Sequence, residues 1–159
     1  NTIMRTLFIS LALLAVSMVA KAQNVESIFE QFKNHENVEL VDVPKELLAF
    51  GLKASGNKDA QKWVDKIDHL RVLSLEEATK ATKKEFQKAV EAFNWKGYDE
   101  MIKVNSEGSK VRIMTQGTNE IIKRLVIYTV EDDECAFVVI DGNIAPKDID
   151  GIIESTTSK

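Results

Sequence analysis

The second half of the chain changes from a helical hydrophobic pattern to four runs typical of β-strands. The gaps between these runs are short and contain polar residues or glycine, and gaps of this size join antiparallel neighbours rather than parallel strands. The four runs cover residues 98–105, 110–116, 120–131 and 135–141. The pattern therefore predicts a four-strand meander. Residues 125–130 are apolar or β-prone on both faces, which indicates a covered central strand.

The first half of the chain has mixed helical and strand patterns. Val25, Ile28, Phe29 and Phe32 have the spacing of one apolar helix face, and Asn24 precedes them as a candidate N-cap. Strands are predicted over 38–43 and 70–75, and helices over 45–54, 59–66, 76–94 and 146–154. Helices early and a meander late predict an α+β fold, in which an antiparallel-rich sheet has its helices packed mainly on one face. We expect residues 23–159 to form one domain.

The longest predicted helix, over 76–94, has a clear apolar side and a clear charged side. Its apolar side includes Phe86 and Val90. The opposite side consists of charged residues, which indicates a face in contact with solvent. These residues are Lys80, Lys83, Lys84, Glu85, Lys88 and Glu91.

Residues 1–22 have the pattern of an export signal that is removed. Met4 and Arg5 form a short positive start, an apolar run follows over 7–20, and Ala20-Lys21-Ala22 fits the cleavage pattern. The apolar run is shorter than the roughly 20 residues of a membrane span. No cysteine lies near the cleavage position to carry a lipid. We therefore expect an exported protein, periplasmic or extracellular, with no stable membrane anchor in the mature chain.

The charge balance disfavours two classes of partner. The chain has 21 lysines and arginines against 25 acidic residues, a net charge of −4. Cleavage of the leading segment would remove only cations and leave the rest more acidic. Phosphate backbones and anionic membrane surfaces need clustered cations. We therefore expect no nucleic-acid partner, and an envelope protein or small ligand of unknown identity instead.

The sequence lacks the common catalytic and cofactor-binding motifs. The sequence contains no phosphate-binding glycine loop, no dinucleotide fingerprint, no zinc-protease or nucleophile-elbow motif and no paired cysteines. A single cysteine excludes an internal disulfide, and two histidines are too few for a multi-histidine metal cage. We expect no catalytic residues, no bound cofactor and no metal.

The remaining catalytic hypothesis is a small hydrolase or redox enzyme that uses Cys135 as its nucleophile. It would need His69, with an acid such as Asp68, within hydrogen-bond reach of the thiol. Acidic residues directly precede Cys135, and they favour the neutral thiol of a packed strand cysteine.

Two acidic segments resemble cation-binding loops only superficially. The run 131–134 lies in a hairpin turn, which supplies few of the oxygens that calcium needs. Asp141 and Gly142 fit a turn that ends a strand, before a helix that starts at Pro146.

The preferred hypothesis is a non-catalytic protein that binds a partner through its sheet or through a groove beside it. The candidate contact residues are side chains expected on an open face of the sheet. They are Lys110, Arg112 and Met114 on one strand, and Lys123 and Arg124 on the next. The alternative for these side chains is simple solvation and protection of a strand edge.

The order of segments along the chain resembles one bacterial family. The segments are VESIFEQF, VELVDVPKELLAF, IDHLRVLSL, YDEMIKVNSEGSKVRIMTQ and IIKRLVIYTVEDDECAFVVIDGNIAPKDI. They are similar to domain-of-unknown-function family 4252, small exported proteins of Gram-negative bacteria, over about residues 24–153. The resemblance implies a compact α+β domain in the periplasm or envelope, and it carries no established activity or functional residues. Some relatives look like lipoproteins, a feature that this chain lacks at its cleavage position.

Overall fold

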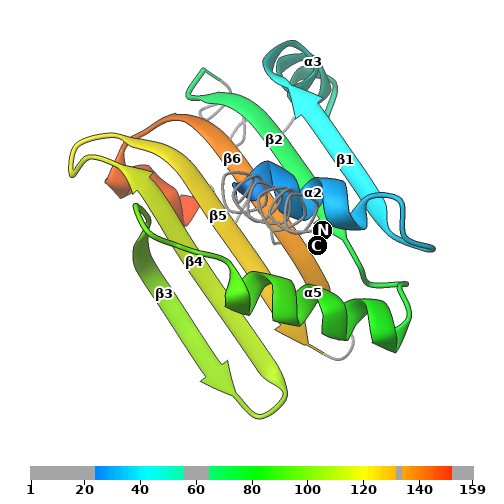
Figure 1. Cartoon of the computed structure of the whole chain (residues 1–159). Helices are drawn as coiled ribbons and strands as arrows, with labels where there is room; N and C mark the ends of the chain where they lie inside the picture. The colour runs from blue at the N-terminus through cyan, green and yellow to red at the C-terminus, as the bar shows by residue number, and fades with distance from the viewer. Residues whose placement is uncertain (1–23, 56–64, 132–133, 152–159) are drawn as a thin grey trace, which may run out of the picture.

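The centre of the protein is one six-stranded antiparallel sheet (Figure 1). The computed structural model describes residues 24–55, 65–131 and 134–151. The strand order is β1-β2-β6-β5-β4-β3. The strands are β1 (Glu39–Pro44), β2 (Ile67–Ser74), β3 (Asp99–Ser106), β4 (Ser109–Gly117), β5 (Ile122–Glu131) and β6 (Cys135–Ile144). The helices are α2 (Val25–Phe32), α3 (Lys45–Ser55), α5 (Lys80–Ala92) and the 3₁₀ turn η1 (Pro146–Asp148).

The predicted meander is confirmed. Strands β3 to β6 follow one another in sequence and in space, and each pairs antiparallel with the next. The four consecutive residues 125–128 of β5 are buried, as expected for a covered strand with neighbours on both sides. The α+β class predicted from the sequence is therefore correct.

One local prediction is wrong, because Asp141 and Gly142 do not form a turn. They lie inside β6, which continues to Ile144 and pairs Gly142 with Ile67 of β2. A Cβ atom on Gly142 would stand 2.1 Å from the carbonyl oxygen of Lys66. The glycine is thus required by the close approach of two strands, and not by a turn.

Helices α2 and α5 cover one side of the sheet, called the helix face below (Figure 1). Asn24 caps α2 by accepting a hydrogen bond from the backbone N–H of Ser27. Thr79 caps α5 in the same way, so this helix begins at residue 80 rather than at 76. The two helices meet the sheet through a chain of aromatic rings. Phe32 lies 5.5 Å from Phe86, and Phe86 lies 6.2 Å from Phe137 of β6, measured between ring centroids.

The other side of the sheet, called the opposite face below, holds a second apolar cluster. Leu48 of α3 and Ile149, just after η1, pack there against Leu125 and Ile140. Helical segments therefore lie on both sides of the sheet, with the two amphipathic helices α2 and α5 together on one. Most of the predicted helix over 59–66 and the export segment lie outside the described residues.

Candidate functional site

The five residues proposed from the sequence do not share an open face. Lys110, Arg112 and Met114 alternate along β4 and point to the helix face, as does Arg124 of β5. Met114 is only 4% exposed and belongs to the core beneath the helices, so its proposed role as a surface contact is wrong. Lys123 is exposed beside a register irregularity of β5, where its Nζ donates to Asn143 Oδ1.

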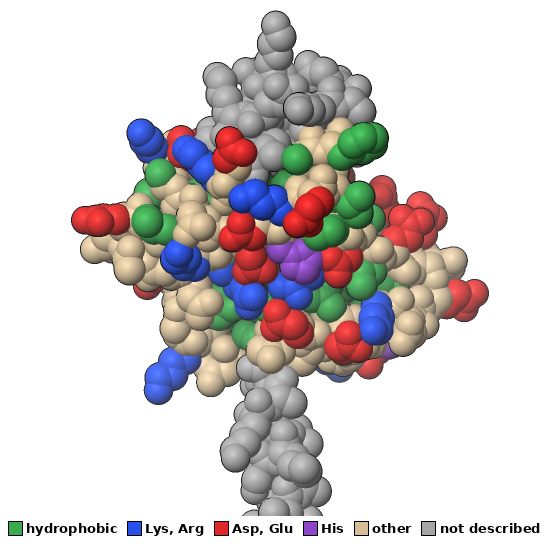
Figure 2. Space-filling view, turned by 90° about the horizontal axis from the view of Figure 1, so that it is seen from above, with side chains coloured by type: hydrophobic (Ala, Val, Ile, Leu, Met, Phe, Trp, Pro, Cys, Tyr) green, Lys and Arg blue, Asp and Glu red, His purple; other side chains and the backbone are tan. Residues whose placement is uncertain are grey.

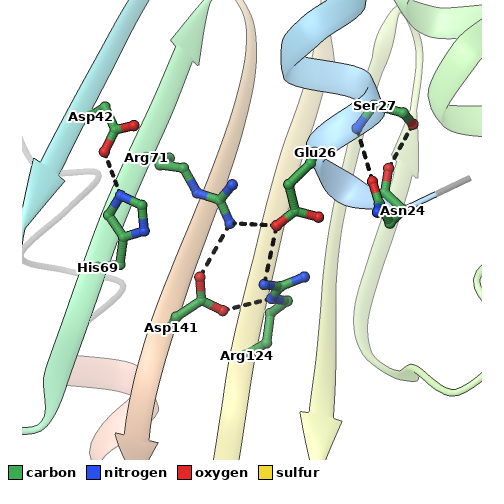
Figure 3. A network of polar contacts seen from close by, with 8 residues as sticks. All are labelled: Asn24, Glu26, Ser27, Asp42, His69, Arg71, Arg124 and Asp141. Atoms are coloured by element: carbon green, nitrogen blue, oxygen red, sulfur yellow. Dashed lines mark hydrogen bonds and ion pairs between the residues drawn. The ribbon is translucent and has the colours of Figure 1, made fainter. Parts of the chain in front are cut away.

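At one end of the helix face, two arginines and two carboxylates form a closed charge network (Figure 3). Asp141 of β6 lies between Arg124 of β5, at 2.6 Å from Nε, and Arg71 of β2, at 3.2 Å from Nη2. Glu26 of α2 accepts from the same two guanidinium groups, at 3.2 Å and 3.4 Å. The network joins a helix to three adjacent strands.

The charges within this network compensate one another. Burial opposes the charge on Arg124, but its hydrogen bonds to Asp141 and Tyr98 outweigh that cost and raise the pKa of its guanidinium. The guanidinium of Arg71 also lies 4.9 Å from the ring centroid of Phe29, a cation–π distance. Each arginine meets both carboxylates. The arrangement therefore serves to attach α2 to the sheet, and it has no spare charge for a ligand.

A hydrogen bond between His69 of β2 and Asp42 of β1 lies beside this network (Figure 3). Figure 2 looks onto this end of the sheet, where acidic and basic side chains are interleaved around a histidine. Such interleaving of both signs keeps the local potential low.

At the other end of the helix face, basic side chains outnumber acidic ones. There a groove of about 580 Å³ lies between α5 and the β3–β4 hairpin. Its lining includes four lysines: Lys80, Lys83 and Lys84 from α5, and Lys110 from β4. In Figure 1, α5 lies across the sheet with the β3–β4 turn beneath it.

A smaller hollow of about 240 Å³ continues this groove along the sheet, because Lys110 lines both. Lys103 of β3 and Arg112 of β4 add two more cations to it. The two hollows together are called the basic groove below. Two carboxylates, Glu91 and Glu131, line it alongside the six cations.

The two carboxylates of the basic groove are already engaged. Glu91 forms an ion pair with Lys110, and that hydrogen bond lowers the pKa of its carboxyl. Glu131 accepts a hydrogen bond of 2.5 Å from the hydroxyl of Ser109.

The arginine of the groove is held in place by a tyrosine and an acid. Arg112 donates to the Tyr128 hydroxyl at 3.2 Å, a bond that raises the pKa of the guanidinium, and Glu100 lies 3.3 Å away. Within the described part of the chain, Lys80, Lys84 and Lys103 have no carboxylate partner. The groove is therefore positive within a chain whose net charge is negative.

The three lysines of α5 lie where the helix itself disfavours them. Lys80 is the first residue of α5, Lys83 and Lys84 follow within the next turn, and the first turn contains no acid. The positive end of the helix dipole makes a cation in this position unfavourable by a few tenths to about 1 kcal/mol. Sequence reasoning assigned these lysines to a solvated face. The sequence prediction began this helix at residue 76, and only the cap at Thr79 places the three lysines in its first two turns.

The structure does not bring together the groups of the catalytic alternative. The thiol of Cys135 is buried, and burial raises its pKa to about 11. His69 pairs with Asp141, six residues along β6 from Cys135, which corresponds to about 20 Å. Asp68 forms an ion pair with Lys45 at 3.6 Å instead.

The described residues contain neither a metal-binding cluster nor a membrane-spanning helix. Among the described residues, no group of three or more histidine, cysteine or acidic side chains is placed to hold a metal ion. None of the described helices has the length and apolar character needed to cross a membrane.

These observations define a class, namely an α+β protein with a continuous six-stranded antiparallel sheet, two helices on one face and a basic groove at one end. Residues 32–152 match the model of a family described as a domain of unknown function, DUF4252. The match covers most of the chain, and the protein belongs to this family. No curated protein and no solved structure matches it.

Proposed function

We propose that this protein is an exported, non-catalytic binding module that holds an anionic partner in the basic groove. One observation carries the proposal: six cations from three separate elements gather around a groove of an acidic chain. Lysines dispersed on a surface need no explanation, but cations that are gathered against a helix dipole lower stability unless an anion meets them.

Two observations support the absence of catalysis in this proposal. A thiol with a pKa of about 11 stays protonated at neutral pH and is a poor nucleophile. Its distance of about 20 Å from His69 leaves it without that base. Export rests on the pattern of residues 4–22, and the cleaved chain should begin near Gln23.

The binding proposal can be tested with poly-L-glutamate, a polyanion that offers carboxylates and no apolar side chains. We expect the protein to bind it in isothermal titration calorimetry, and we expect added salt to weaken this binding because the groove is open to solvent. The double variant Lys80→Gln, Lys84→Gln should weaken binding by about tenfold.

The matched control is Lys88→Gln, Lys96→Gln, which changes the net charge equally with two exposed lysines outside the groove lining. This variant should stay within about twofold of the parent. Equal weakening in both double variants would mean that net charge alone attracts the polymer, and the groove would lose its assignment. Absence of binding by the parent protein would refute the proposed function.

Export has a separate test. The native host should contain the chain outside the cytosol, with its front segment removed and a new N-terminus near Gln23, as read by N-terminal sequencing. Recovery of the intact chain from the cytosol would overturn this part of the proposal without affecting the groove.

A further inference from the structure

The groove is bounded by a strand with an unpaired outer edge. β3 lies at the end of the sheet with β4 as its one neighbour in the described structure (Figure 1). All eight of its residues are exposed. An edge strand of this kind presents a row of backbone N–H and C=O groups that another extended chain can pair with. β3 contains no proline.

The other edge of the sheet is less suited to pairing. β1 ends in Pro44, which lacks a backbone N–H, and α3 begins directly after it. β3 has one irregularity, between Glu100 and Ile102, so the regular stretch runs over residues 102–106. Five residues correspond to about 17 Å of strand.

The two faces of this regular stretch differ in chemistry. Lys103 pairs with Arg112 and Asn105 pairs with Lys110, so these residues border the basic groove on the helix face. Ile102 pairs with Ile113 and Val104 pairs with Val111 on the opposite face. Ile102 and Val104 remain exposed although their partners on β4 are partly or fully buried.

We propose that the anionic partner is an extended protein segment of alternating apolar and acidic residues that pairs with β3 as a seventh strand of the sheet. Its acidic side chains would lie next to Lys103 and two strand spacings, about 10 Å, from the backbone of Lys110, while its apolar side chains would continue the surface of Ile102 and Val104. Side chains of directly opposite residues on paired strands share a face, so one alternating sequence satisfies both sides. The proposal rests on the basic groove as the anion site and names the partner that fits it.

A second copy of this chain fits the same edge less well. Antiparallel pairing of two β3 strands would place both basic grooves on the same side of one continuous sheet, with Lys103 of each copy near the shared edge. Like charges across paired strands are unfavourable. Charge complementarity therefore favours an acidic segment.

The test uses two fluorescein-labelled peptides of about eight residues, made from equal numbers of valines and glutamates. In one the two residues alternate, and in the other they are grouped into separate blocks. Fluorescence anisotropy should show the alternating peptide binding at least about tenfold more tightly than the block peptide. The two peptides have the same charge, so this difference measures strand pairing rather than attraction to the groove.

Two variants locate the site on the sheet. Ile102→Asn should weaken binding of the alternating peptide by about fivefold or more and leave poly-L-glutamate binding unchanged, because Ile102 lies on the opposite face and does not line the groove. Val41→Asn is the matched control. Val41 lies on the same face at the other edge and is likewise exposed, at 49% against 38% for Ile102. Val41→Asn should leave the affinities for the alternating peptide and for poly-L-glutamate unchanged.

Each failure has a distinct meaning. Equal affinity for the two peptides, with poly-L-glutamate still bound, would overturn strand pairing and leave the groove as an anion site. An equal effect of both asparagine variants would remove the assignment to β3. A concentration-dependent dimer in sedimentation velocity that Ile102→Asn abolishes would make a second copy the occupant and overturn the acidic partner. If the parent protein bound neither peptide and also failed to bind poly-L-glutamate, the proposed function itself would be refuted.

Discussion

Replacement of Asp141 by asparagine should reveal how strongly the charge network attaches α2 to the sheet. Asparagine keeps the shape of the side chain but removes the charge that lies between Arg71 and Arg124. Glu26 would then be the one carboxylate of the network left to compensate both guanidinium groups. Arg71 is especially sensitive, because its Nε is buried and has no hydrogen-bond partner in the described structure.

The magnitude follows from the burial of the three side chains. Breaking a fully buried ion pair costs about 3–5 kcal/mol, whereas an exposed pair contributes at most about 1 kcal/mol. The side chains of Arg71, Arg124 and Asp141 are 11%, 22% and 23% exposed. The network thus lies nearer the buried limit, and we expect Asp141→Asn to lower the free energy of unfolding by about 2–3 kcal/mol.

Urea unfolding followed by circular dichroism measures this change directly. The expected loss corresponds to a fall in the melting temperature of about 4–12 °C. Glu30→Gln is the matched control, since it also converts a carboxylate to an amide in an ion pair, that with Lys33 at 2.9 Å on the surface. It should cost less than about 0.5 kcal/mol. An Asp141→Asn variant as stable as this control would refute the conclusion that the network fastens α2.

Four further predictions concern two glycines, the aromatic core and the thiol. Gly142→Ala should destabilise the protein by about 1–3 kcal/mol or more, since the new Cβ would meet the carbonyl oxygen of Lys66. Gly51→Ala, in open space on helix α3, should stabilise the protein by up to about 1 kcal/mol. Thermal melting compares the two alanine variants, and a shift of the melting temperature in the same direction for both would contradict this prediction. Phe137→Ala should lower the free energy of unfolding in urea by about 3–5 kcal/mol, because this fully buried ring contacts Phe29 and Phe86. A decrease below about 1 kcal/mol would show that the aromatic contacts are not central to the core. Iodoacetamide at neutral pH should leave Cys135 unmodified in the native protein and alkylate it in urea, as read by mass spectrometry, whereas rapid native labelling would show an accessible thiolate. The same thiol should favour folding below pH 9 and lose that contribution as the pH rises to about 11, because its folded pKa lies above its ordinary value of 9.0.

The two ends of the helix face show why a count of charges does not identify a binding site. In the network, two arginines meet two carboxylates within 3.4 Å, and this compensation makes the cluster structural. In the groove, cations outnumber carboxylates, and both carboxylates are engaged. The excess of positive charge distinguishes a binding site for an anion from an ion-pair network that joins structural elements.

The strand order shows which strand neighbours the local sequence pattern can predict and which it cannot. The predicted meander β3–β6 is confirmed because its short connections allow few arrangements. The position of β2 against β6 depends on a contact between segments about 70 residues apart, such as Arg71 with Val139. No local pattern indicates that contact, and the location of Gly142 inside a strand depends on it.

The sequence by itself determined the α+β class, the meander, the capped start of α2 and the burial of residues 125–128. Each of these follows from hydrophobic period, turn length or a capping side chain, which act over a few neighbouring residues. Only the tertiary structure decided that Lys80 and Lys84 line one groove with Lys110, that Glu26 reaches Arg71 and Arg124, and that Met114 lies under the helices. Periodicity indicates which side of an element is apolar, but the element that covers it is chosen by packing between distant segments. For that reason the basic groove, built from one helix and two strands, could not be found before the elements were placed together.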